Sequence, residues 1–385
     1  MRRAGVLLHP TALPGTPACG SFGAAAHQWI DALADRGIKA WQLLPLAPTD
    51  GIGSPYSSPS GFALNPWLLD ADQLGADGLI DAAALQRLPG AAAFGPLNPA
   101  VAQARSAAMA QALLQASAGW PQPIRERFEA WKQQENAWLL DHCRFTVLRQ
   151  RYSGQPWWQW PQPLARRQRA ALAQLDQQEA DALLQEALLQ WQLQEQWQRL
   201  LEHARQRGVQ VIGDLPFYVA HDSADVWSHR GLFSARADGS LSQQSGVPPD
   251  YFSATGQLWG TPVYRWPLHR LTRFRWWIRR LQRQLALFDL LRLDHFRALA
   301  AAWCIPGGDT TAQHGRWRAT PGRSLLRQLQ RCCGGELPLI AEDLGVITPD
   351  VEALRDRFGL PGMKILDRKS TRLNSSHSSV SRMPS

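Results

Sequence analysis

The sequence has no apolar run long enough to form a membrane-spanning helix. Such a helix needs about 18 or more consecutive apolar residues, and no run in these 385 residues approaches that length. The first eight residues, MRRAGVLL, resemble the start of a signal peptide, but His9 and Pro10 end the apolar stretch too early. We therefore read residues 5–10 as a buried strand and expect a cytoplasmic protein.

Cysteine is scarce, and its spacing excludes two kinds of structural site. The chain has five cysteines, an odd number, and no two of them form a CxxC pair. A disulfide framework needs paired cysteines, and a zinc site needs closely spaced ligands. Neither is predicted, and the cysteines are expected to be free thiols in the core.

The sequence also lacks a continuous basic segment. Its net charge is +9, but most of the basic residues are arginines dispersed along helical stretches. A nucleic-acid-binding surface would need a basic stripe with base-reading or aromatic partners, so that function is not predicted. Tryptophan, in contrast, is abundant, with 18 residues. Indole rings stack on sugars, although most tryptophans in any protein serve packing.

Six short segments read as buried parallel strands, because their apolar residues are nearly continuous rather than alternating. They are residues 5–10 (GVLLHP), 39–46 (KAWQLLPL), 209–219 (VQVIGDLPFYV), 290–296 (LLRLDHF), 338–344 (PLIAEDL) and 362–366 (GMKIL). Helical periodicity precedes most of them, and the helix at 181–207 ends at Gly208. This alternation predicts an α/β protein with a parallel sheet, either doubly wound or closed into a barrel.

Two of the predicted helices carry further signals. Thr348 and Pro349 predict an N-cap and a first helical residue. Residues 271–285 form one apolar stripe, and the arginines between its apolar residues are placed on the solvated face. These are Arg273, Arg275, Arg279, Arg280 and Arg283.

Two connections between the predicted strands are too long for simple crossovers. After the first two strands (residues 1–46), residues 47–205 begin with a Pro/Gly/Ser-rich rim loop and continue as an inserted helical subdomain. The remaining strands (206–366) contain a second long connection, 220–270, which reads as a loop with its active-site part at 246–266. Loops after strand C-termini build the active sites of parallel α/β folds.

The last 19 residues differ from the rest of the chain. Residues 367–385 (DRKSTRLNSSHSSVSRMPS) contain seven serines and few apolar residues. A natural disordered tail can have this composition. We favour the alternative, that the segment is translated adapter or vector sequence joined to a truncated reading frame.

Three predicted strands end in carboxylates: Asp214 in GDLP, Asp294 in RLDHF and Glu342 in AEDLG. In a barrel these ends converge on one mouth. Glycoside chemistry needs two such groups, one ionised and one holding a proton for the leaving oxygen. Arg292 shares a strand face with Asp294 and favours its ionised form, and Asp214 is placed to anchor this arginine. Structural ion pairs explain the same pattern, and spacing alone leaves both readings open.

The order of motifs along residues 3–366 resembles glycoside hydrolase family 77, the 4-α-glucanotransferases related to α-amylases. Four stretches are similar to its first three strands and its cleft-covering loop: GVLLHPTALPG (5–15), WQLLPLAPTDGIGSPYSSPSGFALNP (41–66), GDLPFYVAHDSADVW (213–227) and GVPPDYFSATGQLWGTPVYRW (246–266). RLDHFRAL (292–299) and AEDLG (341–345) resemble its nucleophile and acid/base segments. The resemblance implies an incomplete (β/α)₈ TIM barrel, with about six of the eight strands present and a mainly helical subdomain inserted.

The resemblance implies that Asp294 is the nucleophile and Glu342 the general acid/base of a retaining double displacement. It also implies substrate-binding roles for eight residues: Tyr56, Asn65, Asp214, Tyr251, Phe252, Trp259, Arg292 and His295. Loop packing is the alternative role for Tyr56, Tyr251 and Trp259, and a structural hydrogen bond is the alternative for His295. Gly61 and Leu64 replace the alanine and glycine usual in the family, which we expect to change only the local loop shape.

The implied activity is that of a hexosyltransferase. It moves α-1,4-glucan segments from a maltodextrin donor to a glucose or maltodextrin acceptor, with no metal, organic cofactor, nucleic acid or membrane partner. The alternatives are an α-amylase-type hydrolase with the same carboxylates and a non-catalytic glucan-binding fragment. The family's third catalytic carboxylate belongs to a His-Asp pair after the seventh strand, but the one histidine after Leu366, His377, precedes Ser378. We therefore expect this chain to be a truncated and inactive form of its parent enzyme.

Overall fold

The computed structural model of the chain describes residues 3–14, 18–50, 53–90, 97–251, 253–345 and 347–365. Phe252 and the predicted tail at 367–385 lie outside the described residues. The chain divides into two compact units. The first comprises Met1–Ile212, Val219–Arg230 and Ala237–Gly239, and the second comprises Gly213–Tyr218, Gly231–Arg236 and Ser240–Ser385. Within the described ranges, no helix combines the length and apolar character needed to cross a membrane.

The N-terminal strands of the first unit begin a parallel sheet. β1 (Gly5–Leu7) pairs with β2 (Ala40–Gln42), and β2 pairs with β3 (Gln210–Leu215). The 3₁₀ turn η1 (Pro10–Ala12) and helix α1 (Ala24–Asp35) lie between β1 and β2. A Cβ at Gly5 would lie 3.0 Å from the Cβ of Ala40, its neighbour across the ladder. Glycine at this position therefore permits the close approach of β1 and β2.

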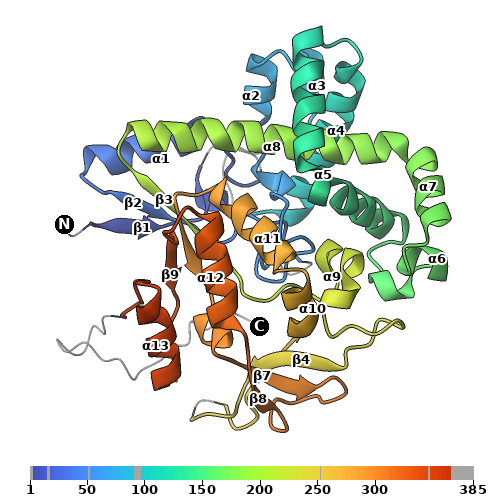
Figure 1. Cartoon of the computed structure of the whole chain (residues 1–385). Coiled ribbons are helices and arrows are strands. Elements are labelled where there is room, and N and C mark those ends of the chain that lie inside the picture. Colours follow the sequence, from blue (N-terminus) through green and yellow to red (C-terminus); the bar gives the residue numbers. More distant parts are fainter. Residues whose placement is uncertain are drawn as a thin grey trace. The chain divides into compact units, whose positions relative to one another are not determined.

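The segment between β2 and β3 is mainly helical. Its elements are η2 (Pro66–Leu68), α2 (Ala71–Ala76), α3 (Ala82–Gln86), α4 (Pro99–Ser117), α5 (Gln122–Arg151), η3 (Trp157–Gln159), α6 (Gln162–Ala165), α7 (Arg169–Gln178) and α8 (Ala180–Gln206). The long helix α8 packs against both α4 and α5 (Figure 1). Phe128 of α5 and Trp191 of α8 meet in this contact, with ring centroids 5.3 Å apart. After β3 follow α9 (Ala224–Ser228) and η4 (Arg230–Leu232).

Tryptophan serves packing first, as expected. Eleven of the 18 tryptophans are buried, and six of these are less than 2% exposed. Trp259 and Trp317 are the two that are exposed, with 37% and 38% of their surface accessible. Sugar stacking on indole rings is therefore restricted to a few positions.

The second unit continues the parallel sheet. The second half of β3 is followed by β6 (Leu290–Leu293), which pairs in parallel with β9 (Leu339–Ala341), and the strand order is β1-β2-β3-β6-β9. Its helical elements are α10 (Trp266–Leu271), α11 (Arg275–Leu285), η5 (Phe296–Leu299), α12 (Gly322–Cys332) and α13 (Pro349–Arg357). Thr348 is the N-cap of α13 and Pro349 its first residue, which confirms that prediction.

The sixth predicted strand, 362–366, is not a strand in its described part, so five of the six predicted parallel strands are present there. Residues 361–365 have irregular backbone. A bond from the Ala341 N–H to the Pro361 carbonyl, 2.8 Å long, joins this segment to the end of β9. The Met363 N–H donates instead to Oδ1 of Asp343 at 2.7 Å. The Asp343 side chain therefore accepts the Met363 N–H, which in a regular β-ladder would donate to a backbone carbonyl of the neighbouring strand.

The predicted loop at 220–270 contains two strands. β4 (Gln243–Val247) and β5 (Gln257–Pro262) pair antiparallel, and with β7 (Ala301–Pro306) and β8 (Arg316–Ala319) they form a sheet of order β5-β4-β7-β8 (Figure 1). β4 reads QQSGV, which lacks apolar alternation, and all four residues of β8 are exposed. These strands therefore escaped a search for apolar periodicity. The predicted active-site loop at 246–266 is largely the β4–β5 hairpin and its turn.

Residues 271–285 form parts of two helices rather than one. α10 ends at Leu271 and α11 begins at Arg275. Between them, Arg273 and Phe274 adopt left-handed φ angles of 52° and 57°. These angles cannot continue a right-handed helix, so the apolar stripe is interrupted.

Two of the arginines predicted to face solvent are buried. Arg280 and Arg283 are 2% and 5% exposed. Nη1 of Arg280 donates to the Phe217 carbonyl at 3.1 Å. Its guanidinium also lies 5.4 and 5.5 Å from the ring centroids of Trp276 and Trp277. A hydrogen bond and two aromatic faces thus compensate for the water that this cation loses.

Candidate active site

Three carboxylates lie at the C-terminal ends of neighbouring strands in the second unit. Asp214 is in β3, Asp294 directly follows β6, and Glu342 directly follows β9. The backbone joins these ends, because the Asp294 N–H donates to the Leu215 carbonyl at 3.0 Å and the Glu342 N–H donates to the Leu293 carbonyl at 3.1 Å. The carboxyl ends of parallel strands meet at one edge of a sheet, so the strand order brings the three acids together.

Arg292 connects two of these acids. Its Nη1 lies 2.8 Å from Oδ1 of Asp214 and 2.8 Å from Oδ1 of Asp294. As predicted, Asp214 anchors the arginine. The Asp214 side chain is only 2% exposed, whereas that of Asp294 is 31% exposed. Asp214 is therefore a buried support, and Asp294 is the carboxylate that a ligand can reach.

Burial and a neighbouring charge act in opposite directions on the accessible carboxylate of Asp294. Burial alone would lower the pKa of Arg292, but the charges of Asp214 and Asp294 raise it above its ordinary value. Burial raises the pKa of Asp294, and the adjacent guanidinium opposes this rise. Arg292 therefore remains charged at every relevant pH and stabilises the anionic form of Asp294.

The pKa of Glu342 is raised as well, and here a negative neighbour adds to the effect of burial. Burial, followed by the negative charge of Asp294, raises the pKa of Glu342 to about 7. Its Oε2 accepts a hydrogen bond from the His295 N–H at 2.9 Å, and its Oε1 accepts one from the Leu344 N–H at 3.3 Å. Two neighbouring acids whose environments separate their pKa values are suited to different roles, one as an anion and one as a proton donor.

The residue after Glu342 is also a carboxylate, but it has a structural role. Asp343 is 9% exposed, and its Oδ2 forms an ion pair with Arg355 of α13. Its Oδ1 accepts the Met363 N–H described above. Successive side chains alternate in direction along extended backbone, so only Glu342 of this pair shares the edge with Asp294.

His295 occupies a strained turn between the two catalytic candidates. Its φ angle is 53°, which is uncommon for a residue other than glycine. The Phe296 N–H donates to the Glu342 carbonyl at 3.1 Å, and this bond helps to fix the turn. The buried Nε2 of the ring has no hydrogen-bond partner among the described residues. Burial, reinforced by the charge of Arg297, lowers the pKa of His295 to about 4, so the ring is neutral at pH 7.

Aromatic side chains lie against this turn. Trp259 of β5 meets His295 edge-on, with ring centroids 4.8 Å apart. Tyr218 lies 6.2 Å from His295 and 6.0 Å from Trp259 by the same measure. Sequence reasoning missed Tyr218, although it stands four residues after Asp214 in the same apolar run. Tyr251 is 97% exposed, and Phe252 lies outside the described residues.

The other two predicted sugar-binding residues belong to the first unit. Asn65 caps η2, where its Oδ1 accepts the Trp67 N–H at 3.1 Å. It is 2% exposed, and its Nδ2 has no partner among the described residues. Tyr56 is half-buried, and its N–H donates to Oγ of Ser54 at 3.3 Å.

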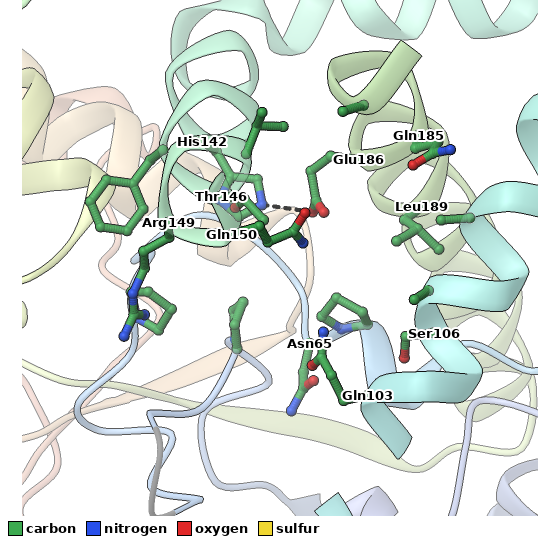
Figure 2. A pocket seen from close by; sticks show the side chains of 18 of the residues that line it. Asn65, Gln103, Ser106, His142, Thr146, Arg149, Gln150, Gln185, Glu186 and Leu189 are labelled. Carbon is green, nitrogen blue, oxygen red and sulfur yellow. Dashed lines mark hydrogen bonds and ion pairs between the residues drawn. The ribbon is translucent and has the colours of Figure 1, made fainter. Parts of the chain in front are cut away.

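Asn65 lines a cavity of about 380 Å³ within the first unit (Figure 2). Opposite it lies a buried pair, in which Nε2 of His142 is 3.0 Å from Oε1 of Glu186. Further polar side chains around the cavity include Gln103, Ser106 and Gln185. The walls thus offer mostly neutral hydrogen-bonding groups, which suit a polyhydroxylated ligand.

Comparisons with known proteins agree on one family. The sequence profile described as 4-alpha-glucanotransferase matches residues 8–383. The chain is 42% identical over 372 residues to the 4-alpha-glucanotransferase of Synechocystis sp., and it covers 72% of that protein. It is 43% identical over 369 residues to the Thermus thermophilus 4-alpha-glucanotransferase and again covers 72%. Both alignments include 95% of this chain.

Solved structures give the same answer for the fold. The amylomaltase from Streptococcus agalactiae in complex with acarbose superposes with a TM-score of 0.88 at 34% identity, covering 94% of this chain and 73% of that one. The amylomaltase from Corynebacterium glutamicum superposes with a TM-score of 0.76 at 18% identity, covering 97% and 52%. The predicted TIM-barrel type of α/β fold is thereby confirmed.

Proposed function

The chain belongs to the 4-alpha-glucanotransferase family, glycoside hydrolase family 77, whose members act on α-1,4-glucans, and we propose that Asp294 and Glu342 carry its reaction. One observation supports this proposal most. Glu342, with a pKa of about 7, stands beside the accessible carboxylate of Asp294, which Arg292 keeps anionic. One group thus holds a proton near neutral pH while its neighbour is free to attack.

In the first step, an Asp294 oxygen attacks the anomeric carbon of the donor glucan. The glycosidic C–O bond breaks, and Glu342 transfers its proton to the departing 4-oxygen. In the second step, the 4-hydroxyl of an acceptor glucan gives its proton to Glu342 and attacks the same carbon, and Asp294 leaves. Two inversions produce a retained α-1,4 linkage.

The neighbouring groups have supporting roles in this proposal. Arg292, anchored by Asp214, balances the charge of Asp294 as the covalent ester forms and breaks. Sugar binding by His295 stays a prediction, because its unpaired ring nitrogen is buried, whereas Trp259 beside it offers an apolar ring to the pyranose. In the first unit, the cavity at Asn65 is suited to a sugar ring. Tyr56 does not line this cavity, and its binding role stays a prediction. The roles of Tyr251 and Phe252, and a cytoplasmic location, stay predictions.

That the chain is truncated and inactive also stays a prediction, so each activity measurement is made on a version completed with the C-terminal part of a relative, with the chain itself in parallel. The donor and acceptor roles are tested with maltotriose. A transferase converts it to glucose and maltodextrins longer than the substrate, because the acceptor sugar outcompetes water. Release of glucose and maltose without longer products would identify a hydrolase instead. Chromatography of the products over time separates these outcomes.

The pKa of Glu342 predicts the alkaline limb of the pH profile. Donor cleavage needs protonated Glu342, so kcat/KM for maltotriose should fall about tenfold per unit as the pH rises above about 7. α-Maltosyl fluoride is the matched control, because fluoride leaves without a proton. Its kcat/KM should stay level across the same range. An equal alkaline fall for both donors would assign the titration to a group other than the leaving-group acid.

The ring of Trp259 should favour transfer over hydrolysis. In Trp259→Ala we expect the share of hydrolysis to rise severalfold, because an acceptor that loses its apolar contact competes less well with water. Trp317→Ala is the matched control, since Trp317 has the same exposure and does not contact His295. The measurement is free reducing ends against disproportionation products. If Trp259→Ala lowers the melting temperature and leaves the ratio unchanged, the ring only packs the hairpin.

A further inference from the structure

A second cavity lies in the second unit, outside the cluster of carboxylates. It has a volume of about 630 Å³ and is lined by residues from the chain after β3, from α10, and from β4, β7 and β8. Three arginines line it, Arg265, Arg270 and Arg318, and no acidic residue does. None of the three forms an ion pair with a carboxylate of the described chain. The cavity therefore has an uncompensated positive charge.

A buried hydroxyl in the wall of this cavity also lacks a partner. Tyr218 is 7% exposed, and its hydroxyl makes no hydrogen bond within the described residues. Its neighbour Tyr264, which lines the same cavity, donates its hydroxyl to the Phe217 carbonyl at 2.6 Å. A buried polar group left unpaired destabilises the folded protein, so an unmatched hydroxyl on a residue that lines a cavity points to a missing polar partner.

The third feature of the cavity is aromatic. Trp266, at the start of α10, lies 5.1 Å from Tyr264 by ring centroids and is half-buried. Its indole contributes an apolar surface to the cavity wall. A ligand that satisfies all three features carries an anionic group, a hydroxyl and an apolar face.

We propose that this cavity binds a phosphorylated monosaccharide. The guanidinium groups of Arg265, Arg270 and Arg318 bind the phosphate, since arginine matches phosphate oxygens with paired N–H donors. Trp266 packs against the C–H face of the pyranose, and the Tyr218 hydroxyl pairs with a sugar or phosphate oxygen. Because Tyr218 also contacts His295 and Trp259, the bound ligand touches a ring shared with the catalytic turn.

The proposal is tested by calorimetry on the full-length protein with glucose 1-phosphate, glucose and inorganic phosphate. We expect saturable binding of glucose 1-phosphate, at least tenfold tighter than either part alone. Saturating maltotriose should not displace it, because the glucan cleft is a different site. Equal affinity for inorganic phosphate would mean that the site binds anions without recognising the sugar, and this would overturn the proposal. Displacement by maltotriose would mean that the two ligands share one site, and it would overturn the proposal too.

Arginine variants test whether glucose 1-phosphate binds in this cavity. The double variant Arg270→Gln/Arg318→Gln should weaken glucose 1-phosphate binding at least tenfold. Arg316→Gln is the matched control, because Arg316 lies on the same strand but outside the cavity wall, and it should bind normally. Equal weakening in both would indicate non-specific attraction and contradict the proposal.

Tyr218→Phe separates a ligand-binding hydroxyl from a structural one. It should weaken glucose 1-phosphate binding severalfold while the melting temperature of the ligand-free protein is unchanged or higher, because an unpaired buried hydroxyl is removed. A lower melting temperature with unchanged affinity would mean that the hydroxyl stabilises the fold, and the proposal would fail.

Discussion

Asp294→Asn is expected to lower the turnover of maltotriose disproportionation by about 10⁴-fold or more, as removal of a catalytic nucleophile commonly does. The amide has the shape of the carboxylate and keeps an oxygen for Nη1 of Arg292, which lies 2.8 Å from Oδ1 in the unsubstituted protein. What it loses is the negative charge that attacks the anomeric carbon. Affinity for maltotriose, measured by calorimetry, should therefore change far less than turnover.

Chemical rescue tests the same role independently. In Asp294→Ala, azide can enter the space of the missing carboxylate and attack α-maltosyl fluoride from the β face. The product should be β-maltosyl azide, with inverted configuration. Asp214→Ala is the matched control, because the Asp214 side chain is 2% exposed and lies behind Arg292, so azide there cannot reach the sugar. Near-normal turnover of Asp294→Asn, or rescue of the Asp214 variant alone, would remove Asp294 from the role of nucleophile.

The acids at the strand ends could be predicted because their surroundings are so apolar. A single carboxylate at the end of a run such as LLRLDHF is costly to bury, and three such runs made a shared edge plausible. The same reasoning placed Arg292 beside Asp294 and Asp214. It named Glu342, but spacing gave no physical reason to prefer Glu342 to Asp343, since both lie in the same predicted strand. The structural reason is that Arg355 and the Met363 N–H, from the segment that follows Asp343, both bind the Asp343 carboxylate.

The wrong predictions share a physical cause. Tertiary contacts determined the structure at positions where the local sequence pattern predicted something else. Arg280 is buried because two tryptophan rings and the Phe217 carbonyl surround it, and no spacing rule reveals those partners. β4 and β8 are strands because they pair with β7, although β4 lacks apolar alternation and β8 is exposed along its whole length. Residues 362–365 have an apolar pattern but do not form a strand, since the Met363 N–H donates to the Asp343 side chain instead of to a neighbouring strand.

Glu342→Gln should affect donors according to their leaving group. For maltotriose, whose departing oxygen needs a proton, kcat/KM should fall about 10²–10⁴-fold, the usual contribution of a general acid. For α-maltosyl fluoride the first step needs no acid, so its rate should fall much less. The second step still lacks a base for the acceptor hydroxyl. The glycosyl ester on Asp294 should therefore accumulate, and mass spectrometry of the intact protein should detect the added maltosyl group.

Azide then distinguishes the two carboxylates by the stereochemistry of the product. In Glu342→Gln, azide is an anion that needs no base, so it should attack the accumulated ester and release α-maltosyl azide, with retained configuration. The Asp294→Ala variant gives the opposite anomer because it never forms that ester. Asp343→Asn is the control for a neighbouring carboxylate. It should keep the donor preference of the unsubstituted protein while losing stability, because Arg355 loses its buried ion-pair partner and keeps only the exposed Asp356. If Glu342→Gln slowed both donors equally, or yielded the β-azide, Glu342 would not be the general acid/base.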